Sequence, residues 1–185
     1  NRGIIHRDLK TGNLVLTHDG SSGGDFIKVV DFGLAMVEST EEDSAMTHTG
    51  FIVGTPAYIA PELLTGRPAD ARSDIYALGA VLYELLCGFP PFYQKDTRKM
   101  FYNRSKDEPP PPSDILGEDL PLDLEEVILI SLRREPDQRF QRVEEFAQAL
   151  DTCNVELGAR KETVEVIRVD HTMEVDSEPM TIGDS

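Results

Sequence analysis

The sequence predicts an α+β fold that is mainly helical and carries one small β-hairpin. Two short apolar runs of strand-forming residues, 14–16 and 26–30, flank a polar, glycine-rich spacer at 18–25, which is the pattern of a hairpin with a loose loop. Residues 73–87 are apolar nearly all round, as in a helix that is buried on every side. Further amphipathic segments follow as far as residue 151.

The composition is that of a soluble globular domain followed by an acidic tail. The chain has 185 residues, 39% of them hydrophobic, which is enough for one domain with a real core. A formal charge of −16 argues against nucleic acid or an anionic membrane as a partner, because both would be repelled. The basic residues are scattered, and the densest group is expected to form an ordinary solvated face: Arg98, Lys99, Arg104 and Lys106.

The same composition predicts a cytoplasmic location for this portion. No apolar run approaches the roughly 20 residues that span a bilayer, and no signal peptide precedes Asn1. The only cysteines, Cys87 and Cys153, are far apart, which indicates a reducing compartment and no metal site built on thiols. A membrane anchor elsewhere in a longer chain is compatible with these observations.

Two motifs carry the chemistry. Residues 5–13 read Ile-His-Arg-Asp-Leu-Lys-Thr-Gly-Asn, and residues 31–33 read Asp-Phe-Gly, 18 residues after Asn13. They contain two carboxylates, one ammonium and one carboxamide, the groups that phosphoryl transfer needs. This pair of motifs resembles the catalytic loop and the metal-binding Asp-Phe-Gly of protein kinases. The resemblance extends over residues 4–151.

The resemblance implies a role for each of these groups. Asp8 would accept the proton of the substrate hydroxyl, and Lys10 would neutralise the γ-phosphate of ATP. Asn13 and Asp31 would offer oxygen ligands to Mg²⁺ or Mn²⁺, since hard cations prefer oxygen. Val15 would touch the adenine ring. ATP and a divalent metal ion are therefore the expected cofactors.

Residues 31–62 resemble a kinase activation segment, which ends in Ala-Pro-Glu at residues 60–62. Within it, Thr55 stands in a Gly-Thr-Pro sequence that resembles the substrate-facing loop, where the threonine hydroxyl bridges the groups corresponding to Asp8 and Lys10. Lys10 and Thr55 together favour serine or threonine over tyrosine as the residue that accepts the phosphate.

Two further threonines in this segment are candidate activation phosphosites. Thr47 and Thr49 form a Thr-x-Thr pair similar to the autophosphorylation sites of bacterial membrane-type serine/threonine kinases. Arg7 precedes the catalytic aspartate, and a phosphate on either threonine would pair with it and order the segment. The alternative is that both threonines belong to a plain linker.

The resemblance also assigns structural roles to five residues. His6 and Phe32 would stack in the apolar column that aligns the site. Asp74 would hold the backbone of the catalytic loop. Arg139, in a Pro-x-x-Arg sequence, would form a buried ion pair with Glu62 and tie the activation segment to the helical body.

The remaining helices are predicted from pattern alone. Ser73 or Asp74 is expected to cap the helix over 73–87. A short, weakly patterned helix is expected over 95–103, and an extended connector over the prolines 109–112. A capping-box pair, Asp123 and Glu126, precedes an apolar face made of Leu124, Val127, Ile128 and Leu132. The last helix is predicted from an apolar face made of Val143, Phe146, Ala147 and Leu150.

The predicted domains are a kinase large (C-terminal) lobe at 1–151 and an acidic tail or linker at 152–185. Residues 151–185 carry nine acidic and three basic residues, which predicts disorder. The Gly-rich loop, strand lysine and helix glutamate of a kinase small lobe are absent from the sequence. The sequence is therefore interpreted as a large-lobe portion that would be inactive alone, with the small lobe of the same chain as a required partner.

The predicted function is that of a bacterial, Hanks-type serine/threonine protein kinase, which transfers the γ-phosphate of ATP to serine or threonine hydroxyls of proteins. The assignment to a bacterial kinase rests on the amino-acid sequences of residues 54–62 and 72–79. A truncated, non-catalytic module that binds partners through the lobe is the alternative. Retention of Asp8, Lys10, Asn13 and Asp31 favours the enzyme.

Overall fold

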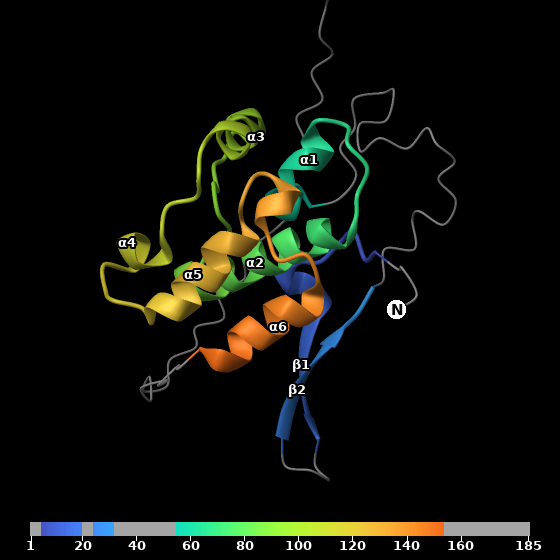
Figure 1. Ribbon diagram of the computed structural model, residues 1–185, viewed down its shortest axis with the longest axis vertical. Coiled ribbons are helices and arrows are strands. Elements are labelled where there is room, and N and C mark those ends of the chain that lie inside the picture. The colour runs from blue at the N-terminus through green and yellow to red at the C-terminus, as the bar shows by residue number, and fades with distance from the viewer. Residues whose placement is uncertain (1–4, 20–23, 32–54, 154–185) are drawn as a thin grey trace, which may run out of the picture.

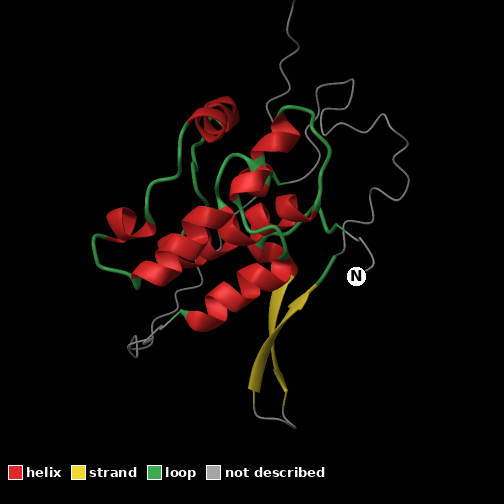
Figure 2. Cartoon of the chain, viewed as in Figure 1, coloured by secondary structure: helices red, strands yellow, loops and turns green. Residues whose placement is uncertain are grey.

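A computed structural model describes residues 5–19, 24–31 and 55–153 of the chain. In these residues, six α-helices and three short 3-10 turns accompany one two-stranded antiparallel sheet. The helices form one body and the hairpin projects from it (Figures 1 and 2). The predicted α+β fold, mainly helical with one small hairpin, is confirmed. No helix of the described residues is both long and apolar enough to cross a bilayer.

The hairpin pairs β1 (Leu14–Asp19) with β2 (Gly24–Val29), with Leu14 opposite Val29. Both strands are longer than predicted, because residues at each end of the expected loop at 18–25 pair in the ladder. His18 was expected in the loop but lies on β1, where its Nδ1 atom is 2.8 Å from Asp25 Oδ1 across the ladder. Cross-strand pairs of this kind extend the ladder beyond the apolar residues.

Helix α2 (Ala71–Cys87) is the centre of the helical body. It begins two residues earlier than predicted because Asp70, and not Ser73 or Asp74, caps it. The Asp70 carboxylate accepts a hydrogen bond from the Arg72 N–H at 2.8 Å, and the Ser73 hydroxyl accepts one from the Asp70 N–H at 3.3 Å. This is a reciprocal capping box in which the expected cap, Ser73, occupies the third helical position.

The all-round apolar pattern of α2 is explained by its neighbours. Helices α5 (Leu122–Ser131) and α6 (Val143–Thr152) pack against it, as Figure 1 shows. Gly79 permits the close approach of α5, because a Cβ atom there would lie 2.7 Å from Ser131 Cβ. The core side chains on these three helices are less than 7% exposed, and they include Ile75, Tyr76, Val81, Val127, Ile128 and Phe146.

Predictions for the later helices are right in type and partly wrong in detail. In α6, Phe146 is buried, but Val143 is 49% exposed and Ala147 is also exposed. Helix α5 is preceded by Pro121 as its N-cap residue, so the predicted Asp123 and Glu126 capping box does not form. The chain enters this helix from a proline-fixed turn, where a side-chain cap has no place.

Three short helical segments differ from the expectation. Helix α3 spans Thr97–Lys106, later than the predicted 95–103, because Asp96 caps it. Pro112 opens helix α4 (Pro112–Leu116) and does not continue an extended connector, since proline suits the first helical position. A third segment, α1 (Pro61–Leu64), was not predicted.

The expected solvated basic face is wrong for one of its members. Arg98, Lys99 and Lys106 are exposed, but Arg104 is only 1% exposed. Its guanidinium donates hydrogen bonds to backbone carbonyls of the 3-10 turn η3 (Pro56–Tyr58). Arg104 therefore lies inside the molecule and does not contribute to a solvated basic face.

Candidate active site

The backbone of residues 6–8 is held by a carboxylate from α2. The N–H groups of His6 and Arg7 donate to Asp74 Oδ2 and Oδ1 at 2.7 and 3.0 Å. Arg7 has a φ of 66°, a left-handed conformation that costs a non-glycine residue about 1–3 kcal/mol unless its surroundings fix it. Burial raises the pKa of the Asp74 carboxyl, and the two N–H bonds partly offset that rise. Asp74 thus holds the loop in a strained conformation.

Four residues with predicted catalytic roles lie in one set of contacts. Lys10 Nζ is 2.9 Å from Asp8 Oδ2 and donates to Thr55 Oγ1 at 3.1 Å. Asn13 Nδ2 donates to the Asp8 carbonyl at 2.8 Å and to Asp8 Oδ2 at 3.1 Å. Both donors therefore reach the same carboxylate oxygen. No described residue donates to the other oxygen, Oδ1.

Asn13 and Asp31 are neighbours through the hairpin. The Val30 N–H donates to the Asn13 carbonyl at 2.9 Å, which brings the start of β1 beside the end of β2. Because the side-chain N–H groups of Asn13 face Asp8, its Oδ1 atom is the acceptor that remains. Asp31 is exposed and has a φ of 53°. An amide oxygen and a carboxylate form a donor set that fits Mg²⁺ or Mn²⁺.

As predicted metal ligands, Asn13 and Asp31 would supply only part of a coordination shell. Among the described residues, no group of three or more histidine, cysteine, aspartate or glutamate side chains surrounds a metal position. Mg²⁺ commonly takes one or two carboxylates and completes its shell with water and phosphate oxygens. Two oxygen donors of this kind would leave the other positions of a Mg²⁺ shell to water or phosphate oxygens.

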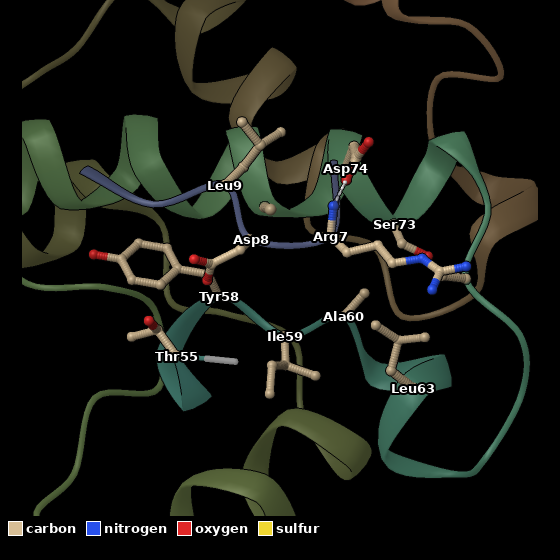
Figure 3. Close-up of a pocket in the computed structure, with 12 residues that line it drawn as sticks. Arg7, Asp8, Leu9, Thr55, Tyr58, Ile59, Ala60, Leu63, Ser73 and Asp74 are labelled. Atoms are coloured by element: carbon tan, nitrogen blue, oxygen red, sulfur yellow. Dashed lines mark hydrogen bonds between the residues drawn. The ribbon is translucent and has the colours of Figure 1, made fainter. Parts of the chain in front are cut away.

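A hollow lies beside Asp8 (Figure 3). Figure 3 shows Asp8 on the loop and Thr55 on the segment opposite it, with a hydrogen bond that joins Arg7 to Asp74 on α2. The walls come from the loop, from the segment after residue 54 and from α2, and they include Arg7, Leu9, Tyr58, Ala60, Leu63, Ser73 and Ala77. The hollow is lined by apolar and polar side chains in similar number, and the side chains of Asp8 and Thr55 are among the polar ones.

A buried hydroxyl network behind this hollow was not predicted. The Tyr58 hydroxyl donates to Glu84 on α2, and Thr11 Oγ1 lies 3.0 Å from the same hydroxyl. Burial raises the pKa of Tyr58, and its bond to Glu84 adds to the rise. The sequence offers no signal for this contact, because Glu84 lies 26 residues from Tyr58 on a helix that otherwise appears apolar.

The predicted pair of Glu62 and Arg139 is present and fully buried. Arg139 Nη1 and Nη2 donate to Glu62 Oε1 and Oε2 at 2.9 and 2.7 Å, and the two side chains are 0% and 3% exposed. Ser73 Oγ also donates to Glu62, at 2.7 Å. Burial alone would raise the pKa of Glu62, but the bonds and charge of Arg139 outweigh it and hold that pKa below its usual range. The pair joins α1 to the segment before α6.

The sequence matches one protein family over most of its length. Residues 1–151 match the family described as "Protein kinase domain". The chain belongs to the protein kinase family.

Bacterial kinases are among its relatives. The chain is 40% identical over 151 residues to "Probable serine/threonine-protein kinase PknB" of Corynebacterium glutamicum, covering 80% of this chain and 22% of that protein. It is 39% identical over 163 residues to "Serine/threonine-protein kinase Pkn1" of Myxococcus xanthus, covering 86% and 23%. It is 37% identical over 165 residues to "Serine/threonine-protein kinase PknB" of Mycobacterium tuberculosis, covering 89% and 25%. The chain thus spans less than a third of each.

The other kinase-derived predictions concern residues outside this cluster. Val15 lies on β1 and is 42% exposed, and the loop residue His6 is 9% exposed, with its Nδ1 atom 3.4 Å from the amide nitrogen of Asp8. Phe32, Thr47 and Thr49 lie outside the described residues. Their roles stay predictions.

Proposed function

We propose that this chain is the catalytic-loop and activation-segment portion of a serine/threonine protein kinase, which transfers the γ-phosphate of ATP to protein hydroxyls. The observation that carries the proposal is the contact set of Asp8, Lys10, Asn13 and Thr55 beside an open hollow. The relatives are named serine/threonine-protein kinases, which favours this enzyme over a non-catalytic binding module.

Asp8 is the acceptor for the substrate proton. Its Oδ2 atom is occupied by Lys10 and Asn13, and its Oδ1 atom remains for a hydroxyl. As the oxygen of a serine or threonine bonds to the γ-phosphorus, the bond from that phosphorus to the bridging oxygen of ADP breaks, and the hydroxyl proton passes to Asp8.

Lys10 places a positive charge between the base and the acceptor side of the site. Its ammonium contacts both Asp8 and Thr55, so it is held where charge develops on the transferred group. Thr55 fixes this ammonium and faces the hollow, which supports a small aliphatic hydroxyl as the acceptor.

Asn13 Oδ1 and Asp31 are the residues that would hold Mg²⁺ or Mn²⁺. A bound divalent ion neutralises phosphate charge and orients the nucleotide. The bond from Asn13 to Asp8 also links this ligand to the base, so both groups are oriented by one amide.

The exposed hairpin supports the proposal that the active enzyme needs a further lobe. Leu16 and Ile27 are 68% and 60% exposed, and Val15 and Phe26 are 42% and 43% exposed. Apolar surface left in water costs about 25 cal/mol per Å² relative to burial. Since the 185 residues also contain no Gly-rich phosphate loop, we expect them alone to transfer no phosphate.

Arg7 and the two threonines form the proposed activation device. Arg7 is exposed, and its guanidinium forms no ion pair with a described residue. A phosphate on Thr47 or Thr49 would supply the missing anion and bind it through two parallel hydrogen bonds.

The test is magnesium-dependent phosphorylation of a serine peptide by the native polypeptide, produced from its complete reading frame. We expect Asp8→Asn to lower the rate about 10²–10⁴-fold, the range for loss of a general base. Asp114→Asn, at an exposed aspartate far from the hollow, is the matched control and should leave the rate unchanged. Absence of transfer by the wild type, or full activity in Asp8→Asn, would refute the proposal.

A further inference from the structure

Arg104 is a buried cation without a buried anion. It lies in the last turn of α3 and is 1% exposed, although arginine is almost never fully buried without a partner. Its guanidinium donates to three backbone carbonyls, Pro56 and Ile59 through Nη1 at 2.6 and 2.8 Å and Ala57 through Nη2 at 2.8 Å. Among the described residues no carboxylate pairs with it. The positive charge is therefore held by carbonyl dipoles.

The three carbonyls belong to the segment that forms one wall of the hollow. They come from the turn η3 and the residue after it, which make few backbone hydrogen bonds of their own. Directly before them, Thr55 accepts the bond from Lys10, and between them Tyr58 bonds Glu84. One guanidinium thus determines the path of a segment whose side chains contact the catalytic loop.

The geometry suits arginine in particular. Its planar fork reaches several acceptors at once, whereas the ammonium of lysine is a single point of charge. An apolar residue would leave the part-buried carbonyls of Pro56 and Ala57 and the buried carbonyl of Ile59 without this donor, which is costly. Burial lowers the pKa of Arg104, and a lysine in the same place would lose its proton more readily.

We propose that Arg104 is a positioning residue for the acceptor side of the phosphoryl-transfer site. It holds residues 56–59 so that Thr55, which accepts the bond from Lys10, and Ile59 line the hollow beside Asp8. The inference rests on the proposed kinase function and adds a residue 45–48 positions away from the carbonyls that it bonds. Arg104 acts through this segment, because it contacts neither Asp8 nor the predicted metal ligands.

The test compares Arg104→Lys and Arg104→Gln with the wild type in the native polypeptide. Initial rates are measured against a serine peptide and, separately, against ATP, and circular dichroism gives the folded fraction. We expect kcat/KM for the peptide to fall about 10- to 100-fold, the effect of misplacing a reactant by about 1 Å. KM for ATP should stay unchanged, because Asn13 and Asp31 keep their positions. Arg98→Lys, at an exposed arginine of the same helix, is the matched control.

The outcomes separate this inference from the kinase proposal. A purely structural role would lower the amount of active enzyme and leave both KM values intact, which would overturn the inference. So would an Arg104→Lys variant as active as the wild type, or the failure of both variants to fold even in the cold, which would make Arg104 a stability residue. A wild type without transfer activity would refute the kinase function, and the role of Arg104 would fall with it.

Discussion

Removal of the Arg139 guanidinium should open the region that joins α1, α2 and the segment before α6. In the wild type it makes two hydrogen bonds to Glu62 and three to the carbonyls of Arg72, Arg133 and Arg134. Arg139→Ala leaves the carboxylate of Glu62, which is 2% exposed, without its cation. Breaking a buried pair from one side costs about 3–5 kcal/mol, because the remaining charge cannot reach water.

The assay is amide hydrogen exchange followed by mass spectrometry on the native polypeptide. This measurement reports local opening, so further domains in a longer chain do not obscure it. Each 1.4 kcal/mol is a tenfold change, so we expect protection of α2 to fall by roughly two to four orders of magnitude in Arg139→Ala. A fall smaller than about tenfold would contradict the assigned burial of this pair.

Two companion variants identify the cause. Glu62→Gln combined with Arg139→Met removes both charges, and it should recover much of the lost protection because a buried pair is often replaceable by neutral residues. Arg142→Ala removes an exposed pair with Glu144, 3.4 Å long and with side chains 63% and 57% exposed. It should change stability by less than about 1 kcal/mol. A double variant as damaged as Arg139→Ala would show that packing, and not the unpaired charge, causes the loss.

Two further predictions concern packing and pH. Gly79→Ala should destabilise the protein by about 1–3 kcal/mol, because the new Cβ atom would lie 2.7 Å from Ser131 Cβ. Gly12→Ala is the control in a thermal melt, because a Cβ atom at Gly12 would have no atom within 4 Å. The folded state lowers the pKa of Glu62, so as the pH falls the unfolded chain takes up a proton at this carboxylate before the folded chain does. The stability advantage of the wild type over Glu62→Gln should therefore be complete above about pH 4.3, the ordinary glutamate pKa. It should be lost as the pH falls through the lower pKa of the folded state. Melting temperatures of both proteins between neutral and acid pH measure this difference, and an advantage that persists in acid would contradict the lowered pKa.

The elements that could be predicted from sequence are those with local causes. The hairpin follows from two strand-forming runs around a glycine-rich spacer, and α2 follows from an apolar pattern that leaves no polar face. Asp8, Lys10 and Asn13 lie within six residues of one another, so the turn that ends at Asn13 is enough to bring them together. The catalytic, cofactor and phosphosite roles of these and the other site residues stay predictions.

The errors have causes outside the local pattern. Ser73 and Asp74 had the right chemistry to cap α2, but Ser73 donates its hydroxyl hydrogen to Glu62 and Asp74 accepts from the catalytic loop. Asp70 is left as the cap. In the same way, Pro112 could not be assigned to a helix from a run of prolines, because the pattern does not show where the extended part ends.

The sequence by itself determined the family, whether most elements are helices or strands, and the chemical groups of the site. This is because sequence motifs and hydrophobic periodicity are local properties of the chain. Only the tertiary structure decided which groups are buried together. Arg104 is indistinguishable in sequence from its exposed neighbours on α3, yet it bonds carbonyls more than 40 positions away. Likewise, Tyr58 meets Glu84 and Thr11 only in the folded chain. Such contacts follow from the packing of α2 and α3 against residues 55–64, and no short-range pattern specifies that packing.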